Sequence, residues 1–110
     1  MKEDIVYLRH ILDAISRIEE YTKGVEYPDF MSNNLVQAGV IREIEIMGGA
    51  SKRLTQKFKE KHPDIPWRKI AGMGDKLIHG YFGVDIDAVW DTVKDDIPRL
   101  KSEIERIVDR

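Results

Sequence analysis

The stretch PWRKIAGMGDKLIHGYFGVDIDAVW, residues 66–90, decides the fold class of this chain of 110 residues. Ile70, Met73 and Leu77 recur at the spacing of one helix face, so the first half of the stretch is an amphipathic helix. Pro66 suits the first position of that helix, because its missing N–H would be unpaired there anyway. The stretch therefore predicts helical rather than strand structure.

Further helices follow toward the C-terminus. Residues 80–83 include two glycines that interrupt the apolar pattern, and Asp85 or Asp87 can cap the next helix. Pro98 can open the last helix. The inward positions of these two helices are Val89, Trp90, Val93, Leu100, Ile104, Ile107 and Val108.

The N-terminal half continues the helical pattern. Apolar residues at helical spacing predict a first helix over residues 3–22, and Gly24 supplies its stop. A second stripe predicts one long helix over about residues 30–61, ended by the His-Pro pair at 62–63. The glycine pair at 48–49 lies in its middle and marks either a close-packing site or a local weakness.

No segment has the pattern of a strand, so we expect an all-α chain: an antiparallel bundle of four to five helices forming a single domain over residues 1–110. A domain of this size gains stability by pairing, so we also expect it to dimerise. With 42% hydrophobic and 35% charged residues, the composition is that of a globular protein with amphipathic helices.

Several classes of site are excluded by composition and spacing. The chain has no cysteine, hence no disulfide and no thiolate ligand. We expect no metal and no cofactor, because His, Asp and Glu are not grouped as metal ligands and no glycine-rich phosphate loop occurs. A signal peptide and a membrane-spanning run are lacking, so we expect a cytoplasmic protein that does not contact a membrane.

The charge is unevenly distributed. The net charge is −2, yet residues 51–80 hold eight Lys and Arg against three acids, which gives this segment +5. Such a block can form a local phosphate-binding surface on an acidic protein. The plainer interpretation is an ordinary solvated helix face, and charge alone favours it.

Proton-transfer chemistry is most plausible on the helix within residues 66–90. Asp75 and His79 are four residues apart and therefore neighbours on one face, turned away from Leu77. A carboxylate beside a histidine orients the ring and raises its pKa, which suits general acid/base work. Gly80 lets the helix end or bend, so that Tyr81 turns back toward His79. Without further context, a surface Asp–His pair is the simpler interpretation.

The segment HGYFGVD, with PW upstream and VWDTV downstream, resembles the signature of the HepT-like toxins, a branch of the HEPN superfamily whose motif reads R-x-x-x-x-H-x-Y. The flanks PWRKIAGM and FGVDIDAVWDTVKDDIP and the segment IREIEIMGGASKRL also resemble this family. The resemblance therefore covers nearly the whole chain.

This resemblance implies an up-and-down helical bundle whose dimer brings two motif copies into one cleft. It implies metal-independent cleavage of RNA, transfer RNA in some members, with His79 as the general acid/base beside Asp75. It also implies a partner, a minimal nucleotidyltransferase antitoxin that attaches AMP to Tyr81. The expected RNA-binding residues are Lys52, Arg53, Arg68, Lys69 and Lys76.

The chain departs from the family pattern at two positions. The motif arginine should stand at position 74, where this chain has Gly74. A glutamate that the family usually has in the helix predicted over residues 30–61 is replaced here by Gly49. A guanidinium stabilises the negative charge that builds on the phosphoryl oxygens, and its loss typically lowers the rate by about 10²–10³. We therefore expect a toxin-family RNase scaffold that is weakened or inactive. The alternative is a non-catalytic HEPN subunit that binds nucleotide or RNA for the nucleotidyltransferase.

Overall fold

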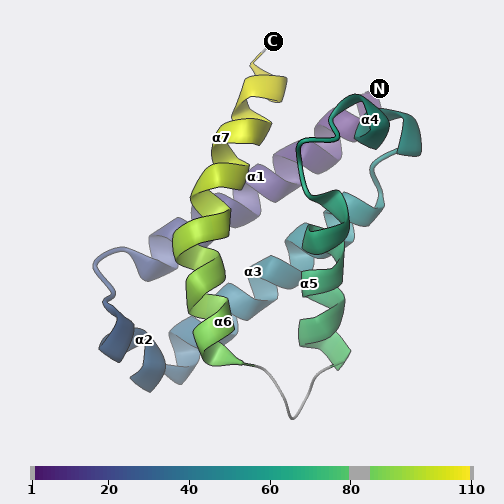
Figure 1. The fold of residues 1–110 in the computed structure, drawn as a ribbon. Coiled ribbons are helices and arrows are strands. Elements are labelled where there is room, and N and C mark those ends of the chain that lie inside the picture. The colour runs from purple at the N-terminus through teal and green to yellow at the C-terminus, as the bar shows by residue number, and fades with distance from the viewer. Residues whose placement is uncertain (1, 80–84, 110) are drawn as a thin grey trace.

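The computed structural model describes the backbone of residues 2–79 and 85–109, and the side chains of residues 3–73 and 85–109. Every regular element in these ranges is helical, which confirms the predicted all-α class (Figure 1). In chain order the elements are α1 (Lys2–Thr22), α2 (Tyr27–Ser32), α3 (Asn34–Lys52), α4 (Gln56–Lys61), α5 (Trp67–His79), α6 (Ile86–Asp91), the π-helical turn η1 (Thr92–Asp96) and α7 (Ile97–Val108).

The first helix agrees with its prediction. α1 runs over Lys2–Thr22 and fully buries the centre of its apolar face, Leu8, Ile11, Ile15 and Ile18, as the periodicity indicated. It ends where the Thr22 hydroxyl donates to the Ile18 carbonyl and Gly24 takes a positive φ of 72°. A side chain would be strained in that left-handed conformation, so the glycine is needed for the chain to leave the helix.

The single long helix predicted over residues 30–61 is wrong, because the structure has three helices there. Asn33 ends α2 and caps α3, its side chain accepting from the Val36 N–H at 3.1 Å. Thr55 caps α4 in the same way by accepting from the Phe58 N–H at 3.2 Å. Residues that bond the backbone locally favour helix ends over helix interiors, so each breaks the apolar stripe into separate helices.

The glycine pair within α3 serves two different purposes. Gly48 is buried in the bundle, as a close-packing site requires. Gly49 is exposed, and a Cβ added there would meet no atom within 4 Å. The packing interpretation therefore applies to Gly48, whereas Gly49 lies open to solvent.

The C-terminal helices form one continuous rod with a widened turn in it. Asp85 caps α6 by accepting from the Ala88 N–H at 3.1 Å, as expected. In η1 the Ile97 N–H bonds to the Thr92 carbonyl, five residues back. Pro98 follows immediately, and a proline cannot donate to the carbonyl four residues before it and would collide with it. The wider π turn makes room there, so the chain continues as a helix instead of starting a new one.

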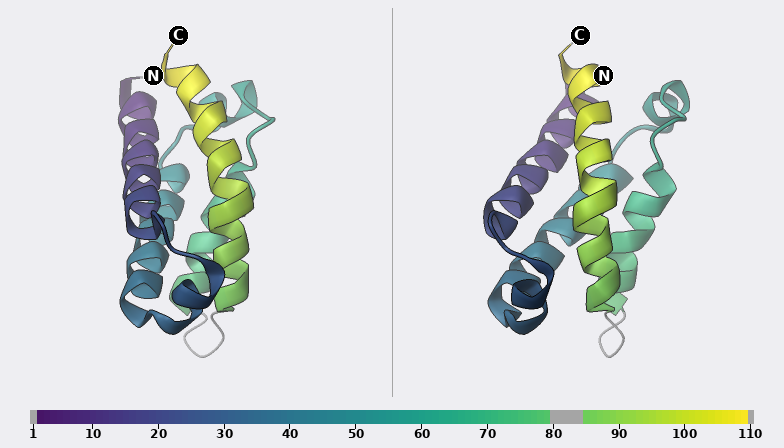
Figure 2. Two further views of the ribbon diagram at one scale, coloured as in Figure 1. Left: turned by 90° about the vertical axis from the view of Figure 1, so that its left-hand side faces the viewer. Right: turned by 60° about the vertical axis from the view of Figure 1, so that its left-hand side comes forward.

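The long segments α1, α3, α5 and the rod from α6 to α7 run alternately in opposite directions (Figures 1 and 2). α1 packs on α3 and on α7, and α3 packs on α5. The short helices α2 and α4 lie at opposite ends of α3 (Figure 1). None of the helices in the described ranges has both the length and the apolar run that crossing a membrane requires.

Candidate functional site

The helix that carries the predicted motif begins at a firm anchor. Trp67, its first residue, is buried, and its indole Nε1–H donates to the His62 carbonyl at 3.0 Å. The Trp67 ring lies 5.9 Å from the Phe58 ring, centroid to centroid, so α5 is joined to α4. Trp67 is thus a core residue, and its contacts fix the direction in which α5 leaves α4.

α5 is a regular helix from Trp67 to His79. Ile70 is buried against the bundle, whereas Arg68 and Gly72 are exposed on the opposite side. The register of the helix puts positions 75 and 79 on the same face as Arg68 and Gly72, one turn apart from each other. The predicted spacing of Asp75 and His79 along one helix face is thus met by the backbone.

The side chains of the predicted motif residues lie outside the described parts of the chain. Positions 74, 75, 76 and 79 belong to a stretch of α5 of which only the backbone is described, and Tyr81 lies outside the described residues altogether. The roles assigned to these residues remain predictions from the sequence.

The predicted RNA-binding residues with described side chains do not form one surface. Lys69 points toward the rod, its Nζ 3.4 Å from both carboxylate oxygens of Asp96. Arg68 lines an open cleft of about 540 Å³ between α4 and α5, which Lys59 also lines. Arg53 lies at the end of α3 with its guanidinium carbon 6.0 Å from the centre of the Tyr7 ring of α1. Lys52, beside it on α3, is exposed. The basic block is therefore divided among several faces of the molecule.

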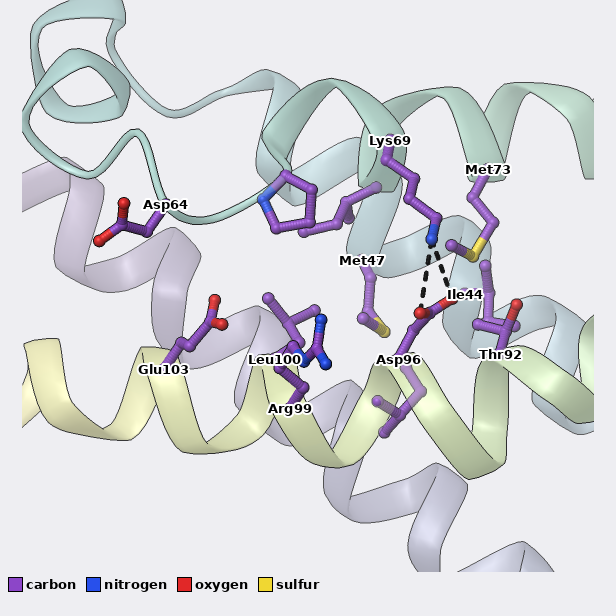
Figure 3. Close-up of a pocket in the computed structure, with 13 residues that line it drawn as sticks. Ile44, Met47, Asp64, Lys69, Met73, Thr92, Asp96, Arg99, Leu100 and Glu103 are labelled. Atoms are coloured by element: carbon purple, nitrogen blue, oxygen red, sulfur yellow. Dashed lines mark hydrogen bonds and ion pairs between the residues drawn. The ribbon is translucent and has the colours of Figure 1, made fainter.

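A partly enclosed cavity among the described residues lies between α5 and the η1–α7 rod. It has a volume of about 280 Å³ and an apolar floor that includes Ile44 and Met47 of α3 (Figure 3). The Lys69–Asp96 ion pair lies at one end, and the carboxylates of Asp64 and Glu103 lie at the other (Figure 3).

Its chemistry does not suit a nucleic acid. Three carboxylates and two cations, Lys69 and Arg99, line the cavity, and Lys69 is already paired with Asp96. The Oε2 atom of Glu103 is buried with no hydrogen-bond partner among the described residues, and the floor is hydrocarbon and thioether, so the lining offers a phosphate more negative than positive groups. We assign this cavity no part in RNA chemistry.

Two polar contacts hold the helices around α5 in place. Glu43 of α3 is buried, and the Arg17 Nε–H of α1 donates to its Oε1 at 2.7 Å, which raises the pKa of Arg17 through that hydrogen bond and the nearby charge. At the other end, the buried Asp4 carboxylate accepts from the Thr55 N–H at 2.8 Å and from the Thr55 hydroxyl at 2.9 Å. Because α3 packs on α5, these contacts set where the motif helix lies.

One cluster of side chains in the structure could not be found from the sequence. Tyr7 and His10 of α1 lie beside Arg53 of α3 around an open depression. His10 is exposed on α1. Nothing in the spacing relates positions 7 and 10 to position 53, because their proximity depends on how α1 and α3 pack. Among the described side chains no three or more His, Asp or Glu residues are grouped so that they could hold a metal ion.

The model of the family described as ribonuclease HepT-like matches residues 11–107. The chain belongs to the HepT-like ribonuclease family. The matched range includes α5 and every expected motif position, so the resemblance read from HGYFGVD is confirmed.

Relatives support the same assignment. A Thermococcus cleftensis protein named "Probable ribonuclease HepT" is 50% identical over 101 residues, covering 92% of each chain. A "Putative RNase" of Caldanaerobacter subterraneus subsp. tengcongensis is 40% identical over 110 residues, covering 100% of this chain and 98% of its own. A Methanocaldococcus jannaschii protein named "Gamma-glutamylcyclotransferase and putative RNase" is 49% identical, and this chain spans 50% of it. No solved structure matches the chain.

Proposed function

We propose that this chain is an endoribonuclease scaffold that cleaves RNA without a metal ion, with His79 as the general acid/base and Asp75 beside it. The observation that carries the proposal is the unbroken course of α5 to His79, within a chain that belongs to the HepT-like ribonuclease family. By helix register, positions 75 and 79 fall on the same side of α5 as Arg68 and Gly72, which are both exposed. A substrate can approach such a face from solvent.

The reaction is attack of the ribose 2′-hydroxyl on the adjacent phosphorus. His79 takes the hydroxyl proton as the O2′–P bond forms. The P–O5′ bond breaks, and the 5′-oxygen of the next nucleotide takes a proton from the protonated His79 or from water. The products are a 2′,3′-cyclic phosphate and a 5′-hydroxyl. No oxidant, reductant or metal is needed for this balance.

Transition-state stabilisation is the weak part of the scaffold. Negative charge grows on the two non-bridging phosphoryl oxygens, and a fixed guanidinium is the group that would meet it without a metal. Gly74 stands where the resemblance expects that arginine. We therefore propose that cleavage is weak or absent in the chain as it stands.

In this proposal the chain is the toxin of a toxin–antitoxin pair in the cytoplasm. Its partner is a minimal nucleotidyltransferase that attaches AMP to Tyr81 and thereby blocks the motif, and RNA, transfer RNA included, is its substrate. The active form is a homodimer with two motif helices facing one cleft. These features rest on the resemblance of HGYFGVD and its flanks to the HepT-like toxins.

A second candidate function is a non-catalytic module that binds nucleotide or RNA and serves the nucleotidyltransferase as a regulatory subunit. The glycine at position 74 favours it, because binding does not require a group that acts only in the transition state. An intact His79-Gly80-Tyr81 favours the nuclease.

Restoring the arginine distinguishes the two candidates. Gly74→Arg should raise cleavage of total cellular RNA by about 10²–10³ in the presence of a metal chelator. The products should end in 2′,3′-cyclic phosphate, and adding His79→Ala should abolish the gain, because arginine stabilises charge but does not move the proton.

The matched control is Gly72→Arg. Gly72 lies in the same helix, is exposed, and a Cβ added there would meet no atom within 4 Å. This variant adds the same charge and helix propensity two residues away from the expected position, so it should cleave no faster than the parent. If both arginine variants fold and Gly74→Arg is as inactive as Gly72→Arg, the binding module becomes the better description.

A further inference from the structure

An open depression of about 320 Å³ lies between α1 and α3. Its lining combines an aromatic ring, an imidazole and a guanidinium with small and apolar residues: Tyr7, His10, Ile46, Gly49, Ala50 and Arg53. α3 packs on both α1 and α5 (Figures 1 and 2). The depression, lined by residues of α1 and α3, and the motif helix therefore both adjoin α3. It is separate from the cavity between α5 and α7, with which it shares no lining residue.

The planar groups are held against one another. The Tyr7 and His10 rings meet edge to face, with centroids 5.8 Å apart and planes at 84°. The Arg53 guanidinium carbon lies 6.0 Å from the centre of the Tyr7 ring. His10 and Arg53 are exposed, and Tyr7 is half-buried. These flat surfaces can stack on a base, and Arg53 makes no ion pair with any carboxylate in the described parts of the chain.

Gly49 keeps the guanidinium accessible. It precedes Arg53 by four residues, so the two positions are neighbours on one face of α3, and both line the depression. A Cβ at position 49 would meet no atom within 4 Å. The backbone therefore has room for a larger residue here, and this side of the depression is empty because the residue is glycine. A longer side chain here would cover the depression, and an acidic one would pair with Arg53 in place of a phosphate.

We propose that this depression binds one nucleotide of a single-stranded RNA, with Arg53 on the phosphate and the Tyr7 and His10 rings against the base. The inference rests on the proposed function in that RNA is the ligand. An unpaired guanidinium suits any anion, but flat ring surfaces beside it select a ligand that carries a planar ring next to its phosphate. Every nucleotide of an RNA carries a base beside its phosphate, whereas a peptide has a ring beside an acidic group only where its sequence supplies one, so a nucleotide fits better.

Binding of a short fluorescein-labelled single-stranded oligoribonucleotide, followed by fluorescence anisotropy, tests the site without relying on cleavage. Gly49→Glu should weaken binding by on the order of tenfold or more, because the new carboxylate pairs with Arg53 and repels phosphate. Gly49→Gln fills the same space without charge and should weaken binding less. Ala38→Glu places the same charge on another exposed position of α3 and should leave the affinity near the parent value.

Two further variants separate the phosphate contact from the base contact. Arg53→Gln should weaken binding and reduce the slope of log affinity against log salt by about 0.7, the value for one phosphate contact on a single strand. Tyr7→Leu should weaken binding by on the order of tenfold, whereas Tyr7→Phe should keep the parent affinity because the ring remains. Thermal melting of each variant by circular dichroism shows whether it is folded.

Three results would overturn the assignment: Gly49→Glu binding as tightly as Ala38→Glu, an unchanged salt slope in folded Arg53→Gln, or equal affinities for Tyr7→Leu and Tyr7→Phe. In each case RNA would still bind, so the proposed RNA substrate would stand, whereas the proposed nucleotide site would be wrong. If the parent protein binds no single-stranded RNA under any salt condition, both the site and the RNA substrate are wrong.

Discussion

At the scale of single residues, Asp4 joins two helices that are distant in the sequence. Its carboxylate is 1% exposed and accepts from the backbone N–H and the hydroxyl of Thr55, the residue that caps α4. Asp4→Ala would remove two hydrogen bonds to a charged group and leave the Thr55 N–H without this acceptor. We expect the free energy of unfolding to fall by roughly 2–3 kcal/mol, measured by urea denaturation.

The control for this change is Glu3→Ala. Glu3 is an exposed acid in the same first turn of α1, so its removal reports the interaction with the helix dipole alone, worth about 0.3–1 kcal/mol. Equal losses in the two variants would mean that the Asp4–Thr55 contact adds nothing of its own.

The directions in which the side chains point explain why the candidate site could be predicted only in part. The alignment of positions 75 and 79 follows from the repeat of a helix, and α5 reproduces it. The direction of Lys69 depends on Asp96, and that of Arg53 on Tyr7, each supplied by another helix. A charge count over residues 51–80 groups these cations, but tertiary packing turns them to different sides.

At the scale of elements, α2 is held to α6 by side chains far apart in the sequence. The Tyr27 hydroxyl donates to Asp87, while the Tyr27 and Phe30 rings pack on Trp90 at centroid distances of 6.1 and 5.0 Å. The bond to Asp87, then partial burial and the charges of Asp87, Asp91 and Asp85, raise the pKa of Tyr27 above its ordinary value of 10.0. α2 is therefore coupled to the ionisation of one phenol.

This coupling predicts a loss of stability at alkaline pH. A raised pKa means that the Tyr27–Asp87 contact stabilises the fold fully below pH 10 or so and loses this contribution as the pH rises through the raised value. Ultraviolet titration of tyrosinate should show one phenol ionising late in the parent and earlier in Asp87→Asn. Tyr27→Phe should remove that late phase, and its persistence in Tyr27→Phe would assign it to a different tyrosine.

Element boundaries were harder to predict than element type. Apolar periodicity identified α1 and α5 almost to the residue, because each stripe is bounded by a strong stop or start. Over residues 30–61 neither Asn33 nor Thr55 interrupts the predicted pattern of apolar residues. Apolar periodicity alone therefore does not reveal that each of these residues caps a new helix. The π turn before Pro98 was also missed, since a proline usually marks a helix start.

At the scale of the whole molecule, the bundle is closed more completely on one side than on the other. α1 packs on α3 and on α7, and Lys101 of α7 bonds Glu19 of α1 at 3.1 Å. Between α5 and the rod there is instead the apolar cavity, crossed by the Lys69–Asp96 pair. α5 packs on α3 and contacts α4 through Trp67 and Phe58, whereas Arg68 and Gly72 on its other side are exposed.

That arrangement leads to a prediction about assembly. A 12.8 kDa chain has a small core, and in the proposed function the cleft is formed by two motif helices that face each other, which requires a second copy. We expect light scattering at micromolar concentration to give about twice 12.8 kDa. Because folding would be linked to association, the melting temperature should rise with protein concentration. A mass of 12.8 kDa with a concentration-independent melting temperature would show that the chain acts as a monomer, and the cleft would then have to form within one chain.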